Sequence, residues 1–109
     1  RPSSEREMHR RIYAARGDVR AVIHTHSAAL QTFAACREGL RTPEIVAPCA
    51  AYGVSGSKKL AESASEVLRS HDLCIMANHG FTAVAADLET ALSRAVAAEE
   101  AAKRILESE

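Results

Sequence analysis

Three histidines are the strongest candidates in this chain for a metal-binding or catalytic site. His24 and His26 end the apolar run 19–26, and His79 closely follows a second apolar run, 73–77. Because side chains alternate faces along a strand, His24 and His26 point to the same side of one strand end. If the two runs form neighbouring strands, His79 completes a site of three imidazole nitrogens. Three histidines with one open position are the usual ligand set of a catalytic zinc ion, so the pattern favours a metalloenzyme.

Other interpretations of the histidines remain open at this stage. A single histidine at a strand end is more commonly a hydrogen-bonded structural residue. The H-x-H pair, and a third histidine beside Gly80 where the backbone allows close approach, favour a shared metal instead. A structural zinc site is disfavoured, because no fourth cysteine or histidine lies at ligand spacing. We expect structural roles for His9 and His71, the latter at the C-terminus of a helix.

A second group of candidate residues opens the first expected helix. Glu5 is the candidate general acid/base, because its helix leads into the strand of His24. Free backbone amides at a helix start favour an anion such as phosphate, which makes Ser3 and Ser4 candidate ligands for it. The alternatives are plain helix capping by Ser4, with Glu7 completing an S-x-x-E box, and a first-turn acid at position 5. The residues alone leave both interpretations open.

Hydrophobic periodicity predicts alternating helices and strands, and therefore an α/β domain in which a layered sheet is covered by helices. Gly17 and Gly39 are expected to end the first two helices, and Ser27 and Ser57 to cap the second and third, with a loop over 52–56. The expected helices are 4–15, 27–37, 57–70 and 87–106, and the expected strands are 19–24, 44–47, 73–77 and 81–85. The expected apolar faces include Met8, Ile12 and Tyr13 in the first helix and Leu88, Ala91, Leu92, Ala95, Ala98 and Ala102 in the last.

Composition excludes several classes of partner. The chain has 109 residues, and its 14 basic and 14 acidic residues cancel, which argues against nucleic acid or a membrane surface held by bulk charge. No apolar run approaches the roughly 20 residues of a membrane helix. Cys36, Cys49 and Cys74 are odd in number and widely spaced, as expected for reduced thiols in a cytoplasmic protein.

The combined motifs resemble the class II aldolase/adducin family over essentially the whole chain. The similarity is carried by Pro2-Ser3-Ser4-Glu5, by His9, by the stretch 21–27 and by Asn78-His79-Gly80. The segments 48–53 and 87–92 are most similar to the bacterial L-fuculose-phosphate aldolase branch of that family.

This resemblance implies a function for each candidate residue. His24, His26 and His79 would hold Zn²⁺, although imidazole ligands suit Mn²⁺, Fe²⁺ and Co²⁺ as well. Glu5 would be the general acid/base, and Ser3 and Ser4 would bind the substrate phosphate. The implied reaction is cleavage of a sugar 1-phosphate, L-fuculose 1-phosphate first, to dihydroxyacetone phosphate and an aldehyde such as L-lactaldehyde, without a lysine Schiff base.

The resemblance also defines the alternatives. Epimerases of this superfamily typically carry aspartate where Glu5 stands, so glutamate favours an aldolase, while a dehydratase or decarboxylase stays open. A non-catalytic adducin-like module is disfavoured, because a scaffold has no need of three histidines and this acid. The family implies a cytoplasmic homotetramer, and its members carry further segments before the Ser-Ser-Glu motif and after the last helix. We therefore expect residues 1–109 to be one partial class II aldolase/adducin-like domain.

Overall fold

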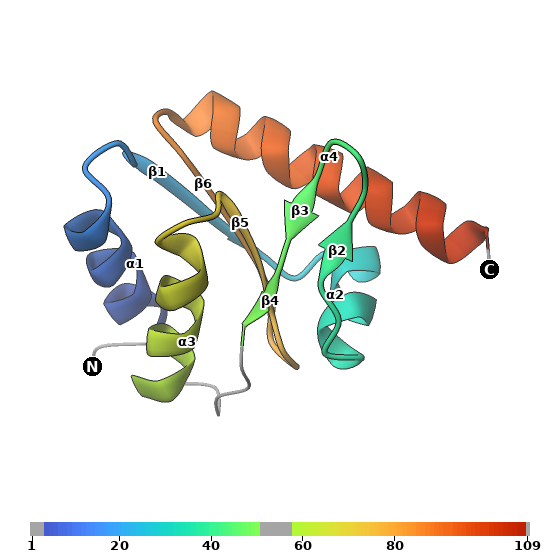
Figure 1. The fold of residues 1–109 in the computed structure, drawn as a ribbon, viewed down its shortest axis with the longest axis horizontal. Helices are drawn as coiled ribbons and strands as arrows, with labels where there is room; N and C mark the ends of the chain where they lie inside the picture. The colour runs from blue at the N-terminus through green and yellow to red at the C-terminus, as the bar shows by residue number, and fades with distance from the viewer. Residues whose placement is uncertain (1–3, 51–57, 109) are drawn as a thin grey trace.

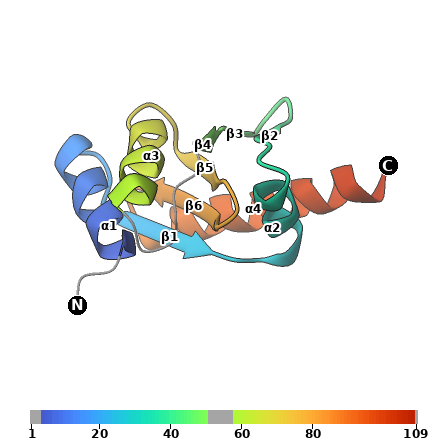
Figure 2. The ribbon, with the colours of Figure 1, turned by 90° about the horizontal axis from the view of Figure 1, so that it is seen from below.

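A central sheet lies between two layers of helices, as Figures 1 and 2 show for the computed structural model, which describes residues 4–50 and 58–108. Helices α1 and α3 pack together on one face of the sheet, and α2 and α4 on the other. The expected α/β layered fold is confirmed. The helices are α1 (Ser4–Ala15), α2 (Ala28–Ala35), α3 (Lys58–Leu68) and α4 (Leu88–Glu107), and the strands are β1 (Ala21–Thr25), β2 (Leu40–Arg41), β3 (Val46–Ala47), β4 (Cys49–Ala50), β5 (Leu73–Met76) and β6 (Gly80–Ala85).

The order of strands in the main sheet is β1-β6-β5-β4. Strand β6 is antiparallel to both neighbours, with Thr25 opposite Phe81 on one side and Met76 opposite Gly80 on the other. The strands that precede His26 and His79 are therefore not neighbours, contrary to the arrangement considered from the sequence. A tight β5–β6 hairpin inserts β6 between them, and this leaves His79 in the turn at the same end of the sheet as the end of β1.

Strand pairing near β4 was largely missed by the sequence prediction. The expected strand over 44–47 is reduced to β3, which pairs with β2 in a separate two-stranded sheet. Strand β4 joins the main sheet parallel to β5. Two-residue strands are too short for hydrophobic alternation to reveal them. The expected loop over 52–56 and the Ser57 cap lie outside the described residues.

Two apolar cores occupy the two faces of the sheet. On the α2/α4 side the core contains Ile75 and Phe81, and on the α1/α3 side it contains Met8, Cys74 and Val84. Successive residues of β5 and β6 thus enter opposite cores, as the alternation of a strand requires. Every residue of both strands is buried, which explains their continuous apolar sequence.

Helix α4 packs on the sheet through alanines rather than leucines. Ala91, Ala95 and Ala98 are buried, as expected, but Leu88 and Leu92 are 65% and 53% exposed. The small side chains let the helix lie close to β1 and β6, and the leucines fall on its outer side. Tyr13 of α1, expected on the inner face, is likewise exposed. None of the helices in the described ranges is long and apolar enough to span a bilayer.

The N-terminus of α2 is capped by another helix. Ser27 occupies the N-cap position, but its side chain makes no capping hydrogen bond, contrary to expectation. The backbone N–H groups of Ala29 and Leu30 instead donate to the two carboxylate oxygens of Glu99 in α4, each at 3.1 Å. A carboxylate at a helix N-terminus both accepts these bonds and complements the helix dipole. Glu99 therefore fixes the start of α2 against α4.

Replacing Glu99 with alanine is expected to lower the free energy of unfolding by about 1–2 kcal/mol, the usual effect of a lost cap. Two N–H groups would lose their acceptor at a part-buried position. Urea denaturation followed by circular dichroism measures the change. Glu100→Ala is the matched control, since Glu100 is an exposed neighbour and its loss should stay within about 0.5 kcal/mol. Equal effects of the two substitutions would contradict the capping role.

The C-terminus of α2 also differs from expectation. The helix ends at Ala35, and Arg37 adopts a left-handed conformation with φ 56°. Gly39, expected to end the helix, has a different role. A Cβ atom there would lie 3.0 Å from the carbonyl oxygen of Ala47 and 3.2 Å from the amide nitrogen of Cys49. Glycine therefore lets this segment pass close to the backbone that enters β4.

Candidate metal centre

The structure brings His24, His26 and His79 together. One ring nitrogen from each lies within 4.8 Å of the others. The ring centroids are 4.8 Å apart for His24 and His26, 5.0 Å for His24 and His79, and 5.1 Å for His26 and His79. His24 and His79 are partly buried and His26 is exposed, so the cluster opens to solvent on the side of His26.

Strand register and one glycine create this cluster. His26 follows Thr25 at the end of β1, and the pairing of Thr25 with Phe81 places it beside the turn that carries His79. A Cβ atom at Gly80 would lie 2.7 Å from the carbonyl oxygen of Thr25 and 3.1 Å from Nδ1 of His26. Real Cβ atoms do not approach a backbone oxygen so closely, so the expected need for close approach at Gly80 agrees with the structure.

A buried hydroxyl orients the first histidine. Nδ1 of His24 lies 3.1 Å from Oγ1 of Thr82, the residue opposite it on β6. The Thr82 hydroxyl donates to the sulfur of Met76 at 3.2 Å, so its oxygen can accept a hydrogen bond from the Nδ1–H of His24. A hydrogen bond in that direction goes with the tautomer that carries the proton on Nδ1 and the lone pair on Nε2. Histidines that bind metals are normally oriented by such a bond from the other ring nitrogen.

The donor set fits a divalent first-row metal ion. Zinc–nitrogen bonds of about 2.0–2.1 Å allow two imidazole nitrogens on one ion to lie at most about 4.2 Å apart. The ligand atoms here lie within 4.8 Å of one another, so small rotations of the side chains bring them into range. Three neutral nitrogen donors suit zinc and its neighbours, and three protein ligands leave coordination positions open.

The other site residues predicted from the sequence stand at the start of α1. Ser3 lies outside the described residues, and Ser4 and Glu5 are described only as helical backbone. The cluster formed by described side chains therefore consists of the three histidines. Glu5, Ser3 and Ser4 remain predictions as site residues.

The two remaining histidines make local contacts. The ring of His9 packs edge-on against Tyr13, with centroids 6.5 Å apart. Nδ1 of His71 lies 3.3 Å from the carbonyl oxygen of Val67 and 3.1 Å from the hydroxyl of Ser70. These contacts at helix surfaces and ends agree with the structural roles expected for both histidines.

The three cysteines are free thiols with different environments. Cys36 is exposed, Cys49 is partly buried and Cys74 is buried. Burial raises the pKa of Cys74 to about 12, and burial also raises the pKa of Cys49. Because a thiolate is the reactive form, Cys49 and Cys74 are both held in the unreactive state at neutral pH.

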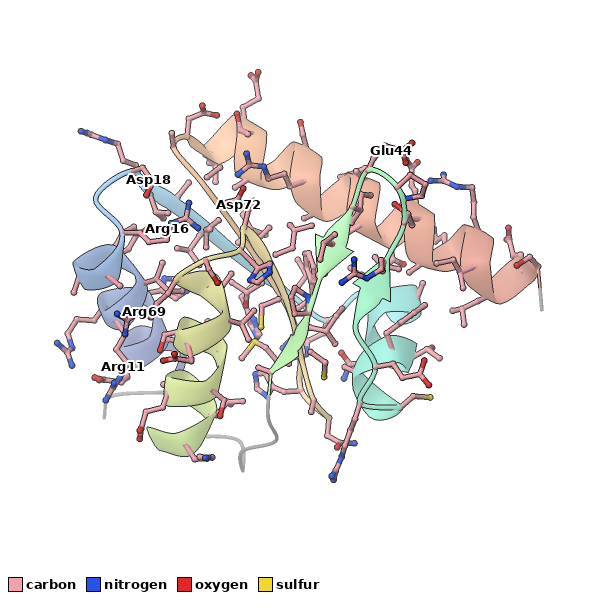
Figure 3. The ribbon with its side chains drawn as sticks, in the orientation of Figure 1. Arg11, Arg16, Asp18, Glu44, Arg69 and Asp72 are labelled. Carbon is pink, nitrogen blue, oxygen red and sulfur yellow. The ribbon has the colours of Figure 1, made fainter. Side chains whose placement is uncertain are left out.

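A cluster of charged residues lies at the opposite end of β1. Figure 3 shows Arg16 reaching toward Asp18 and Asp72, at 2.7 and 3.0 Å. The same guanidinium donates to the carbonyl oxygens of Leu68, the last residue of α3, and of His71, three residues later. Arg16 lowers the pKa of Asp18, and Asp18 is the main cause of the raised pKa of Arg16. The cluster links α1, α3 and β5, and its charged groups pair with one another and with backbone carbonyl oxygens.

Thr82 is the residue of the centre that sequence reasoning missed. It is fully buried and is the sole residue with a polar side chain in the run Gly80–Ala85. A polar side chain inside an otherwise apolar strand beside a histidine pair is the signal that could have identified it, because buried hydroxyls need hydrogen-bond partners.

Comparison with known proteins identifies the family. Residues 1–106 match the model of the class II aldolase and adducin N-terminal domain, so the chain belongs to this family. It is 36% identical over 110 residues to an L-fuculose phosphate aldolase of Methanococcus maripaludis, covering 94% of this chain and 60% of that protein. It is 34% identical over 102 residues to the 5-deoxy-D-ribulose 1-phosphate aldolase of Bacillus thuringiensis, covering 85% and 47%.

Solved structures show the same relationship. An L-fuculose 1-phosphate aldolase superposes with a TM-score of 0.89 at 30% identity, covering 98% of this chain and 54% of the other. The L-fuculose-1-phosphate aldolase of Thermus thermophilus gives a TM-score of 0.82 at 26% identity, covering 96% and 60%. The chain thus spans about half the length of the relatives it matches.

Proposed function

We propose that the full-length protein is a metal-dependent class II aldolase that cleaves L-fuculose 1-phosphate to dihydroxyacetone phosphate and L-lactaldehyde. The observation that carries this proposal is the convergence of His24, His26 and His79 within a fold of the class II aldolase family. Relatives named as aldolases of ketose 1-phosphates support the choice of substrate class.

In this proposal the three histidines hold a divalent ion, with Zn²⁺ first and Mn²⁺, Fe²⁺ or Co²⁺ as alternatives. When bound, such an ion supplies Lewis-acid polarisation of a substrate carbonyl. Thr82 keeps the imidazole of His24 in the tautomer that presents Nε2. The exposed side of His26 leaves the approach for a substrate open.

Glu5 is proposed as the general acid/base, and the packing of α1 supports this. The sulfur of Met8 lies 4.0 Å from Oγ1 of Thr82, which itself contacts His24. Position 5 lies one turn before Met8 on the same face of the helix, because residues three apart are neighbours on a helix surface. Ser3 and Ser4 are proposed to bind the substrate phosphate with the free amides of the helix start.

The remaining features of the proposal concern the whole protein. Residues 1–109 form part of a class II aldolase/adducin-like domain, and further segments complete the substrate pocket. A cytoplasmic homotetramer is the assembly that the family implies.

A coupled assay tests the proposed reaction. Full-length protein loaded with Zn²⁺ is mixed with L-fuculose 1-phosphate, and release of dihydroxyacetone phosphate is followed through glycerol-3-phosphate dehydrogenase and NADH. The proposal expects release that stops after treatment with a chelator and returns with Zn²⁺. A parallel reaction with 5-deoxyribulose 1-phosphate tests the substrate of the Bacillus relative. No release from L-fuculose 1-phosphate, with metal bound at about one ion per subunit, would overturn the proposed reaction.

Replacing Thr82 with valine is expected to weaken Zn²⁺ binding by about 10–100-fold, the usual effect of losing the partner that orients a metal ligand. Valine has nearly the same shape but cannot accept a hydrogen bond from the Nδ1–H of His24. Competition with a chromophoric chelator measures the dissociation constant. Thr82→Ser keeps the hydroxyl and should retain most of the affinity. Equal affinities for the valine and serine variants would contradict the orienting role.

A further inference from the structure

Two residues with left-handed backbone conformations meet beside the histidine cluster. Among the described non-glycine residues, only Arg37 and Asn78 have positive φ angles, 56° and 57°. This conformation is disfavoured for residues with a Cβ atom, most of all for a large side chain such as arginine. Nε of Arg37 donates a 2.6 Å hydrogen bond to Oδ1 of Asn78, 41 residues away in sequence.

The backbone around Arg37 would favour glycine. The N–H of Glu38 donates to the carbonyl oxygen of Phe33 at 3.0 Å, and the N–H of Arg37 donates to that of Ala34 at 3.1 Å. These two bonds define a helix-ending motif whose left-handed position is most commonly occupied by glycine. Since backbone conformation disfavours arginine here, its presence points to the side chain, which reaches Asn78.

Asn78 attaches the turn that carries His79 to the end of α2. The N–H of His79 donates to the carbonyl oxygen of Met76 at 2.8 Å, and Asn78 is the third of the four turn residues, where positive φ favours glycine or asparagine. The N–H of Asn78 donates to the carbonyl oxygen of Ala34 at 2.7 Å. The turn is therefore attached to the end of α2 by one backbone bond and by two side-chain bonds of Asn78, the one from Arg37 and a 3.5 Å bond from its Nδ2 to the carbonyl oxygen of Ala35.

Helix α2 thus connects the two ends of the cluster. The helix begins two residues after His26, and its first amide groups donate to Glu99. At its other end, the carbonyl oxygen of Ala34 accepts a hydrogen bond from Asn78, the residue before His79. We propose that Arg37 and Asn78 are positioning residues that hold the turn of His79 at the distance from His26 that metal binding requires. The inference rests on the proposed metal site, and it assigns a role to a pair of residues outside the ligand set.

Glycine substitutions separate positioning from general stability. Arg37→Gly keeps a conformation that the backbone prefers but removes the donor to Asn78. We expect the dissociation constant for Zn²⁺ to rise about tenfold, the lower end of the range for second-layer partners of metal ligands. The melting temperature of the metal-free full-length protein should stay nearly constant, because relief of strain offsets the added freedom of the unfolded chain. A lower melting temperature with unchanged Zn²⁺ affinity would overturn the proposal.

Two further variants test the pair itself. Arg37→Lys has the same backbone cost but restores a donor, so its Zn²⁺ affinity should exceed that of Arg37→Gly. Asn78→Gly removes the hydrogen bond from Arg37 and also the one from Nδ2 to Ala35, so it should weaken binding at least as much as Arg37→Gly. The double variant should bind no more weakly than Asn78→Gly alone, because the bond between the two side chains is lost only once. Additive losses in the double variant would contradict a shared role.

Amide hydrogen exchange distinguishes failure of this inference from failure of the metal site. If the unchanged protein binds no Zn²⁺, the proposed metal centre is wrong. The positioning role is then judged in the metal-free protein, where Arg37→Gly should speed exchange of the His79 amide by about tenfold, since its bond to Met76 depends on the fastened turn. Unchanged exchange at His79 would overturn the positioning role.

Discussion

Replacing His26 with alanine is expected to abolish stoichiometric metal binding by the full-length protein, and activity with it. His26 is exposed, so its truncation removes a proposed ligand with little loss of packing. Loss of an orienting partner weakens Zn²⁺ binding by about 10–100-fold. Loss of the ligand itself should weaken binding further. The metal content measured after gel filtration should fall from about one ion per subunit to less than about a tenth of an ion.

The control for this experiment is a histidine outside the cluster. His9 packs against Tyr13 on α1, and His9→Ala should leave the metal content unchanged. Similar melting temperatures of the two metal-free variants would exclude unfolding as the cause. Full metal occupancy in His26→Ala would refute the assignment of three histidine ligands.

Replacing Glu5 with glutamine should lower turnover of the full-length enzyme by about 10²-fold or more, the range expected for a lost general acid/base. Glutamine keeps the size and polarity of the side chain but cannot exchange a proton. The metal content should stay close to that of the unchanged protein, because the three proposed histidine ligands remain. Measurement of kcat in the coupled assay, with metal analysis of the same sample, separates the two effects.

Glu7 provides the matched control on the same helix. Its carboxylate pairs with Arg10 and Arg11 at 2.6 and 2.7 Å, and Arg10 is the main cause of its lowered pKa. Glu7→Gln removes an acid from the same region of α1 without touching the proposed proton transfer, so kcat should be nearly unchanged. Equal losses in the two variants would remove Glu5 from the mechanism.

The histidine cluster was predictable because its signals are local. The H-x-H spacing fixes two side chains on one face, and Gly80 marks the close approach that lets His79 join them. The order of the strands was not predictable in the same way. Both apolar runs were identified as strands, but hydrophobic pattern alone does not reveal that β6 pairs with β1 on one side and β5 on the other.

Residues that support the cluster were missed because their roles depend on contacts distant in sequence. Glu99 caps a helix that begins about 70 positions earlier, and Arg37, just after α2, reaches Asn78 in the hairpin turn 41 residues later. Local rules assigned the cap to Ser27 and the helix end to Gly39. Tertiary structure overrode both, since capping acceptors and left-handed residues can be supplied or stabilised by another element.

X-ray absorption spectroscopy of the Zn²⁺-loaded full-length protein tests the central claim most directly. A centre built from His24, His26 and His79 predicts a nitrogen shell at about 2.0–2.1 Å, with the outer scattering of about three imidazole rings. Sulfur scattering at about 2.3 Å would assign the metal to cysteine instead. That result, or a shell without imidazole scattering, would contradict the three-histidine centre.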